Sequence, residues 1–175
     1  MAHLNVEIKA RTSKLEVLHE LLIKAGARAV GTDHQVDTYF EVPNGRLKLR
    51  EGNIEHTLIH YHRPDQAEVK SSDVALYHPG AEKGLKEVLQ RAMEVKVIVD
   101  KVRKIYFIGN VKFHLDRLDG MGDFVEIEAI DKKGTLGEAY LREQCESYMR
   151  LLGIQEEELV DRSYSDLILE RDETK

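Results

Sequence analysis

The chain has 175 residues, of which 42% are hydrophobic and 33% are charged, and its formal net charge is −6. This length suffices for one domain with a substantial core, and we expect a single domain over residues 1–175. The acidic balance gives no general attraction to nucleic acid or anionic membranes, and no apolar run approaches the roughly 20 residues of a membrane span. The one cysteine, Cys145, cannot form an internal disulfide, which fits a reducing cytoplasm.

Residues 5–11 alternate strictly between polar and apolar side chains, which predicts a β-strand with two different faces. Asn5, Glu7 and Lys9 lie on the polar face, so charges of both signs stand two residues apart. One interpretation is an ordinary amphipathic surface strand whose polar face meets water. The alternative is a polar face that looks into a shared interior and binds something charged.

A helix and a second strand follow. Thr12 or Ser13 can cap a helix, and Ser13 and Glu16 have the spacing of a capping box. Apolar residues then recur at helical spacing until Gly26. We expect this helix to lie on the outside of the sheet and to cover the apolar face of a strand. Residues 36–42 are rich in β-forming side chains and predict a strand, which the turn-forming residues 43–45 end.

The strand predicted at residues 46–51 carries a row of cations. Arg46, Lys48 and Arg50 share one face at a spacing of about 7 Å, and they repel one another unless water or an anion lies against them. A solvated edge strand is the plain alternative, because charges on an edge discourage aggregation. Together with the acidic strands of this chain, the row favours an anion-binding site.

Residues 57–63 predict a further strand, and its two faces differ in chemistry. Ile59, Tyr61 and Arg63 share one face, and two histidines share the other. The pair His60 and His62 could bind a transition metal, but the sequence offers no third ligand nearby.

The middle of the chain is expected to be less regular. Residues 64–80 are expected to form a long connection that can hold a short strand near Lys70. Apolar residues at helical spacing predict a second amphipathic helix over residues 81–93.

The next predicted unit is a hairpin over residues 95–118 that turns at Gly109 and Asn110. Ionisable side chains fall on one face of both strands, namely Lys101, Arg103, Lys112, His114 and Asp116. A further strand at residues 124–129 repeats the alternation of the first strand and places Glu126 and Glu128 on one face.

Two helices are predicted near the C-terminus. Residues 136–152 carry an apolar stripe that includes Cys145, so we expect this thiol in the core rather than as a nucleophile. Residues 164–169 predict a short final helix, and the residues from Glu170 onward are expected to fray.

Hairpin-linked strands with helices inserted at intervals predict an antiparallel sheet and the α+β class. Many of these strands have ionisable groups on one face and apolar groups on the other. An open sheet would leave the ionisable face in water. A closed barrel could enclose that face only if water, metal and a polyanion neutralise it, because unpaired buried charge costs several kcal/mol. We interpret the pattern as such a barrel, polar within and covered by helices outside.

Several short motifs follow one another in a fixed order along the chain. They are Asn5-x-Glu7-x-Lys9, Asp37-Thr38-Tyr39-Phe40, Gly45-Arg46-Leu47-Lys48-Leu49-Arg50-Glu51, Tyr61-x-Arg63-Pro64-Asp65, His114-Leu115-Asp116, Gly122-Asp123-Phe124-Val125-Glu126-Ile127-Glu128 and Ser163-Tyr164-Ser165-Asp166-Leu167. This ordered combination resembles the CYTH family, whose members include class IV adenylyl cyclases of the CyaB type and thiamine triphosphatases. The resemblance covers nearly the whole chain and is greatest to the CyaB-type branch.

The resemblance implies an eight-stranded antiparallel β-barrel tunnel that binds a triphosphate and a divalent metal, Mg²⁺ or Mn²⁺. Three carboxylates match the family's metal ligands, namely Glu7, Glu126 and Glu128. The cations that match its phosphate-binding residues are Lys9, Lys48, Arg50, Arg63, Lys101, Arg103 and Lys112. The resemblance also implies catalytic roles for three residues, which are Lys9, Arg63 and Asp116.

Two positions depart from the family's pattern. The signature begins with a glutamate, and Asn5 stands there instead, so one negative charge near the metal is lost although an amide oxygen can still be a ligand. Lys112 stands where many relatives carry arginine. The lysine keeps the positive charge but lacks the bidentate geometry of a guanidinium group.

The resemblance therefore implies an enzyme that converts ATP to cyclic AMP and pyrophosphate with a divalent metal. A phosphohydrolase acting on inorganic triphosphate, thiamine triphosphate or a nucleotide is the second interpretation. A non-catalytic protein that binds a nucleotide or polyphosphate is the third, and Asn5 keeps it open. Whether the protein forms a homodimer is also left open by the sequence.

Overall fold

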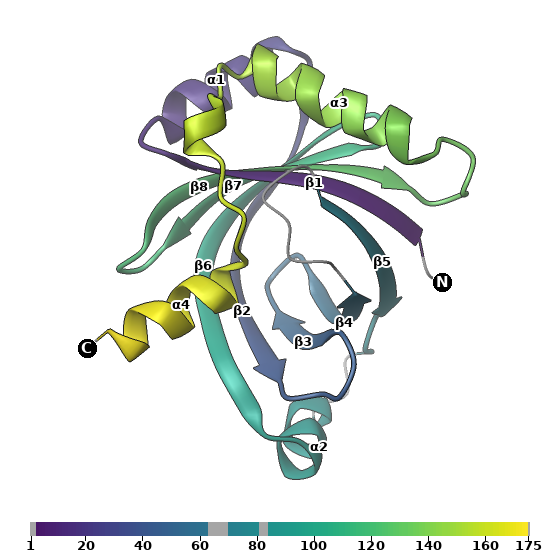
Figure 1. Cartoon of the computed structure of the whole chain (residues 1–175), viewed down its shortest axis with the longest axis vertical. Coiled ribbons are helices and arrows are strands. Elements are labelled where there is room, and N and C mark those ends of the chain that lie inside the picture. Colours follow the sequence, from purple (N-terminus) through teal and green to yellow (C-terminus); the bar gives the residue numbers. More distant parts are fainter. Residues whose placement is uncertain (1–2, 63–69, 81–83, 175) are drawn as a thin grey trace.

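The computed structural model describes residues 3–62, 70–80 and 84–174, and its strands close into an antiparallel barrel (Figure 1). The order around the barrel is β1-β5-β4-β3-β2-β6-β7-β8. The strands are β1 His3–Thr12, β2 Arg28–Phe40, β3 Arg46–Glu51, β4 His56–His62, β5 Lys70–Tyr77, β6 Val95–Ile108, β7 Val111–Leu118 and β8 Gly122–Asp131. The predicted α+β class and the predicted eight-stranded antiparallel barrel are both confirmed.

Strand β1 closes the barrel because it pairs with β8 on one side and with β5 on the other. In the pairing with β8, Glu7 lies opposite Glu128 and Lys9 lies opposite Glu126. Two stretches that are more than a hundred residues apart in sequence therefore place their charged side chains side by side. Because side chains alternate along a strand, these four charged residues share the inner face of the barrel.

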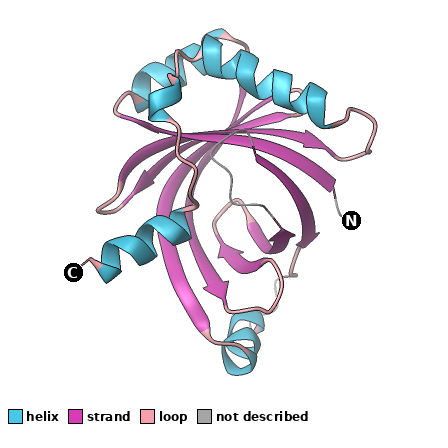
Figure 2. Ribbon diagram, in the orientation of Figure 1, coloured by secondary structure: helices cyan, strands magenta, loops and turns pink. Residues whose placement is uncertain are grey.

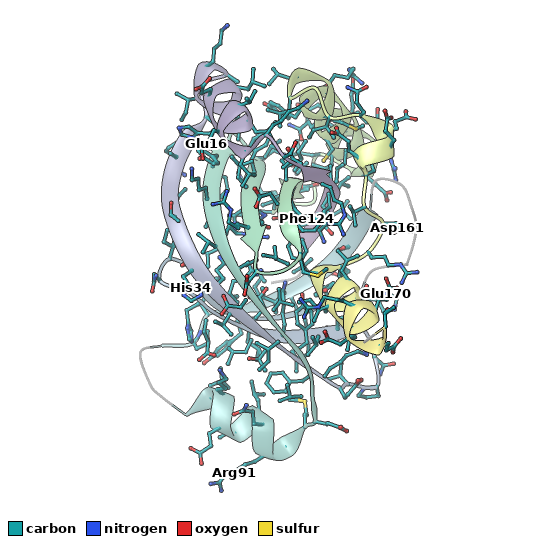
Figure 3. All side chains as sticks on the ribbon, turned by 90° about the vertical axis from the view of Figure 1, so that its left-hand side faces the viewer. Glu16, His34, Arg91, Phe124, Asp161 and Glu170 are labelled. Carbon is teal, nitrogen blue, oxygen red and sulfur yellow. The ribbon has the colours of Figure 1, made fainter. Side chains whose placement is uncertain are left out.

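Helices surround the barrel on the outside (Figure 2). They are α1 Leu15–Lys24, α2 Leu85–Ala92, α3 Glu138–Leu151 and α4 Tyr164–Glu173, with a short 3₁₀ helix, η1, at Glu156–Glu158. Helices α1 and α3 cover the outer faces of β1, β7 and β8, and α4 packs beside β6. Figure 3 shows α1 with Glu16 and α2 with Arg91 at opposite ends of the molecule, and Glu170 of α4 between them.

The main hydrophobic core lies between the barrel wall and helices α1 and α3, rather than inside the barrel. Its members come from the outward-facing positions of β1, β7 and β8, such as Val6, Phe113 and Ile127, and from the apolar stripes of the helices. Cys145 lies in this core, where its thiol donates to the carbonyl oxygen of Val6 at 3.3 Å, and burial raises its pKa to about 12. The predicted core position of Cys145 is confirmed. Because the raised pKa keeps the thiol protonated, we expect it to be unreactive.

A second apolar cluster attaches α4 to the barrel. The ring of Tyr164 packs edge-on against Phe124 of β8, with 5.0 Å between the ring centroids. Ile168 of α4 and Val99 of β6 belong to the same cluster. The final helix runs to Glu173 and not only to residue 169, so the prediction that the chain frays from Glu170 is wrong for residues 170–173.

Two other predictions of local structure need correction. Neither Thr12 nor Ser13 is the N-cap of α1: the N-cap residue is Lys14, whose backbone N–H donates to the Thr12 hydroxyl at 3.0 Å. The strand predicted at 36–42 is part of β2, which begins at Arg28 because its first half pairs with β6. Sequence periodicity could not show this pairing, since much of that half is exposed.

The predicted long connection at 64–80 contains strand β5, which pairs with β1 and β4. Residues 63–69 lie outside the described residues. The amphipathic helix predicted at 81–93 exists as α2, but none of its residues is buried, and Val88 is 62% exposed. Among the described residues, no helix combines the length and apolarity needed to cross a membrane.

We expect Phe113→Ala to lower the free energy of unfolding by about 3–5 kcal/mol, because it leaves a cavity in the core. The Phe113 side chain is fully buried and packs edge-on against Tyr148 of α3, with 4.9 Å between the ring centroids. Urea unfolding followed by circular dichroism measures the change. The matched control is Val88→Ala on the exposed face of α2, which should stay within about 0.5 kcal/mol of the wild type. Similar losses in both variants would contradict a core placed outside the barrel.

Candidate functional site

The barrel encloses a cavity of about 360 Å³ whose described lining carries charges of both signs. The cationic lining residues are Lys9, Lys48, Arg50, Lys101, Arg103, Lys112 and Lys132. The carboxylates in the lining are Glu7, Asp37, Glu55, Glu126 and Glu128. Seven cations against five carboxylates leave the described lining with an excess of positive charge, which suits an anionic ligand.

The structure brings together nearly all the site residues predicted from the sequence. Every predicted phosphate-binding and metal-binding residue that it describes lines this one cavity. Arg63 lies outside the described residues, so its predicted role stays a prediction. Asp116 is fully buried and does not line the cavity; it lies behind Arg103 and Tyr164 and binds both.

Asp37 of β2 is the anchor for three of the cations. Its carboxylate accepts two hydrogen bonds from the Arg50 guanidinium, both at 2.9 Å, and one from the Lys101 ammonium at 2.8 Å. The Lys48 ammonium lies 3.3 Å away. Burial by itself raises the pKa of Asp37, but these three cations together hold it well below its usual range. The carboxylate therefore stays ionised and fixes the cations against their mutual repulsion.

Asp116 of β7 anchors Arg103 in the same manner. The guanidinium of Arg103 donates to both Asp116 oxygens, at 2.6 Å and 2.5 Å, and also to Glu126 at 2.7 Å. The Tyr164 hydroxyl donates to Asp116 at 2.6 Å, and burial raises the pKa of that hydroxyl well above its usual value. Asp116 is thus placed to orient Arg103 rather than to touch a ligand.

The C-terminal segment contributes Ser163 and Tyr164 to the lining of the cavity. The Lys9 ammonium donates to the carbonyl oxygen of Arg162 at 3.2 Å and lies 4.0 Å from the centre of the Tyr164 ring. The Arg46 guanidinium donates to the Ser163 hydroxyl at 2.7 Å and to Asp166 at 3.0 Å. Arg46 therefore holds the start of α4, although the sequence analysis grouped it with the other cations of β3.

The three predicted metal ligands differ in their surroundings. Glu126 accepts from Arg103 and from the His114 ring at 3.0 Å, and the Lys9 ammonium lies 3.3 Å away. Burial raises the pKa of Glu128, and the neighbouring Glu7 raises it further despite the opposing effect of a nearby lysine. Glu7 and Glu128 thus form a concentration of negative charge on adjacent strands, where a cation would be favourable.

The carboxylates of Glu7, Glu126 and Glu128 form a carboxylate-rich corner of the cavity, and their oxygen atoms are suitable ligands for a hard divalent ion. Mg²⁺ uses oxygen ligands and keeps several waters, so one or two carboxylates together with substrate phosphates suffice. Asn5, beside Glu7 on β1, donates its side-chain N–H to Glu128, and its buried amide oxygen has no hydrogen-bond partner among the described residues. Within the same part of the chain, no three His, Cys, Asp or Glu side chains form a ready-made metal cluster.

One wall of the cavity is apolar. Strands β4 and β5 contribute Ile59, Tyr61, Val74 and Leu76 to the lining, opposite the charged residues of the other strands. The cavity therefore presents a charged part for an anion and an apolar part for an uncharged ring or chain.

Three residues that bind the charged side chains of the site were not among those predicted from the sequence, namely Asp37, Glu55 and Tyr164. Asp37 lies on the inward face of β2, and continuing the alternation of that strand inward would have found it. Glu55 lies in the turn between β3 and β4, and Tyr164 begins a helix, so neither position carries a periodic signal that points to the cavity.

We expect the free energy of unfolding of the ligand-free protein to rise between about pH 7 and pH 9, because burial lowers the pKa of Lys101 to about 7, although Asp37 opposes the shift. The unfolded lysine, with a pKa of 10.5, binds more protons than the folded one over this range, so the slope is positive, at most about 1.4 kcal/mol per pH unit. Urea unfolding at several pH values measures it. Lys101→Met should remove the rise, whereas Lys104→Met on the outer face of β6 should retain it. An equal slope in all three proteins would contradict the assignment.

Comparisons with known proteins agree with the fold. A model of the CYTH domain family matches residues 3–164. The adenylate cyclase CyaB of Aeromonas hydrophila is 25% identical over 173 residues, which covers 93% of this chain and 87% of that protein. The PH1012 protein of Pyrococcus horikoshii has a TM-score of 0.80 at 26% identity and covers 93% of this chain and 98% of that chain.

A more distant structure shares the fold alone. HpAC1 from Hippeastrum, an adenylyl cyclase candidate with a dominant triphosphatase activity, has a TM-score of 0.61 at 11% identity. It covers 97% of this chain and 95% of that chain. Because the CYTH match spans nearly the whole chain and the barrel encloses the charged cavity that the motifs predict, this chain belongs to the CYTH family.

Proposed function

We propose that this protein is a CyaB-like, class IV adenylyl cyclase that converts ATP to cyclic AMP and pyrophosphate in its barrel. The observation that carries the proposal is one cavity with a cationic excess, a carboxylate-rich corner and an apolar wall. The similarity to CyaB over 93% of the chain supports the same reaction.

The triphosphate is assigned to the cationic lining. A nucleoside triphosphate carries about four negative charges, and several lysines and arginines neutralise them better than any single residue. Arg50 and Arg103 are held by bidentate carboxylate partners, so their guanidinium groups are oriented before the ligand arrives. Lys48 and Lys101 share Asp37, which places both beside Arg50. This orientation lowers the entropy cost of binding.

The nucleoside is assigned to the apolar wall of β4 and β5. Ile59, Tyr61, Val74 and Leu76 offer a surface against which a base or ribose can pack, and an inorganic triphosphate has no use for it. This wall is the feature that favours a nucleotide substrate over inorganic triphosphate.

In the cyclisation, the ribose 3′-hydroxyl gives up its proton to solvent and its oxygen forms a bond to the α-phosphorus, while the bond from that phosphorus to pyrophosphate breaks. Glu7, Glu126 and Glu128 would hold the divalent ion, Mg²⁺ or Mn²⁺, with Asn5 as a neutral neighbour. When bound, this ion would supply positive charge that lowers the pKa of the attacking hydroxyl and screens the phosphates. Lys9 and the arginines stabilise the negative charge that develops on the leaving pyrophosphate. Asp116 acts through Arg103, which it orients, and Arg63 is expected to add a further phosphate contact.

A triphosphatase is the second candidate, because the same cations and carboxylates would serve water as the nucleophile. The Hippeastrum protein, which shares this fold, has a dominant triphosphatase activity. A non-catalytic polyphosphate-binding protein is the third candidate. Asn5 supports it, because its side chain already donates to Glu128 and supplies no charge for a metal.

We expect incubation with ATP and Mg²⁺ or Mn²⁺ to yield cyclic AMP and pyrophosphate in equal amounts. Chromatography of the products from ATP, inorganic triphosphate and thiamine triphosphate separates the candidates. Orthophosphate without cyclic AMP would replace the cyclase with the triphosphatase, and binding without any product would support the non-catalytic protein.

We expect Glu126→Gln to lower metal-dependent turnover by about a hundredfold or more, because one of the carboxylates at the metal corner loses its charge. The fold should persist, since Arg103 keeps its two hydrogen bonds to Asp116. Turnover and Mn²⁺ affinity measured in the presence of triphosphate report the effect. Glu138→Gln, at the start of α3 outside the barrel, is the control and should match the wild type. Unchanged Mn²⁺ affinity in Glu126→Gln would remove this residue from the metal site.

A further inference from the structure

Glu55 reaches into the cavity from the turn between β3 and β4. Its carboxylate accepts from the Arg50 guanidinium at 2.9 Å and from the Gln35 amide at 3.0 Å, and it also binds the Lys112 ammonium. Arg50 belongs to β3 and Lys112 to β7, two strands that are not neighbours in the barrel. One carboxylate therefore bridges two cations across the cavity, as a phosphate group would.

The turn that carries Glu55 is fixed by a buried aspartate. The carboxylate of Asp33 accepts from the backbone N–H groups of Asn53, Ile54 and Glu55, at 2.5, 2.9 and 3.0 Å. The Gln35 amide donates to Asp33 at 2.8 Å and thereby links the turn to the Glu55 carboxylate. The position of Glu55 is thus set by a network of hydrogen bonds and is not a chance contact of a surface side chain.

Gly52 is necessary for this arrangement. A Cβ atom at residue 52 would lie 2.6 Å and 2.8 Å from the two Asp33 carboxylate oxygens and 2.8 Å from the Glu55 carbonyl oxygen. Only glycine therefore lets the turn approach Asp33 this closely. Because the turn lies against Asp33, the side chain of Glu55 points into the cavity.

Glu55 differs from Asp37, the other carboxylate that binds Arg50. Asp37 is 1% exposed and has three cationic partners, so its removal from the site would leave several buried charges unpaired. The side chain of Glu55 is 21% exposed, so it can turn to water without any opening of the barrel. Asp37 is the permanent partner of Arg50, and Glu55 is the replaceable one.

We propose that Glu55 is a built-in counter-anion that competes with a phosphate group of the ligand for Arg50 and Lys112, and so sets how tightly the cavity holds a polyphosphate. The inference rests on the triphosphate part of the proposed function, but not on turnover. Burial by itself raises the pKa of Glu55, yet Lys112 and Arg50 hold it below its usual range, which keeps the carboxylate charged and competitive. A ligand phosphate takes over the two cations, and Glu55 moves into solvent.

Calorimetric titration with inorganic tripolyphosphate in EDTA tests the competition without metal or turnover. We expect Glu55→Gln to bind tripolyphosphate about tenfold more tightly than the wild type, which corresponds to about 1.4 kcal/mol. The glutamine keeps the shape of the side chain and loses the charge that competes with phosphate. Glu51→Gln is the matched control, because Glu51 lies near the same turn but pairs with Lys86 of α2 at 2.6 Å, and its affinity should equal that of the wild type. Thermal melts of all three proteins show that each is folded.

Equal or weaker binding by Glu55→Gln in EDTA would overturn the proposal. Equal binding in EDTA together with weaker binding in Mg²⁺ would in addition identify Glu55 as a metal ligand. Absence of tripolyphosphate binding in every protein would overturn both this inference and the phosphate site. Tighter binding by Glu55→Gln in a protein that makes no cyclic AMP would instead support the inference and refute only the cyclase assignment.

Discussion

The neutralisation of charge buried inside a closed barrel is the constraint on which this structure depends. Asp37 and Asp116 each bind an arginine through two hydrogen bonds, and further partners complete both clusters. Lys101 and Arg103 are each 2% exposed, so water hardly screens their charges. Without these carboxylates, such cations would repel one another strongly. The anchors therefore serve the fold and the site at once, because they orient the same cations that are available to an anionic ligand.

A charged interior also decides where the hydrophobic core must lie. The outward faces of β1, β7 and β8 carry the apolar residues, so α1 and α3 bury them outside the barrel. The opposite side of the barrel has less cover, and α2 there buries none of its own residues. Stability is consequently concentrated on the side of the barrel that α1 and α3 cover.

In the ligand-free barrel, much of the cationic charge is already satisfied by protein carboxylates. Binding a polyphosphate is then an exchange of partners rather than the filling of an unpaired charged site, and affinity depends on the carboxylates that remain as well as on the cations. Glu55 is an example of such a carboxylate, because it binds both Arg50 and Lys112 and its side chain is 21% exposed to solvent. Asp37, in contrast, is fully buried and keeps its partners.

The alternation of polar and apolar residues in the sequence determined which side chains share a face, because a strand has a period of two wherever it lies. That rule placed Glu7, Lys48, Arg103 and Glu126 on polar faces, and the family motifs added the closed barrel. Tertiary structure alone decided that Glu55 enters the cavity from a turn, that Asp116 lies behind Arg103, and that β5 pairs with β1. These three features depend on contacts between segments far apart in the chain, and local periodicity holds no information about such contacts.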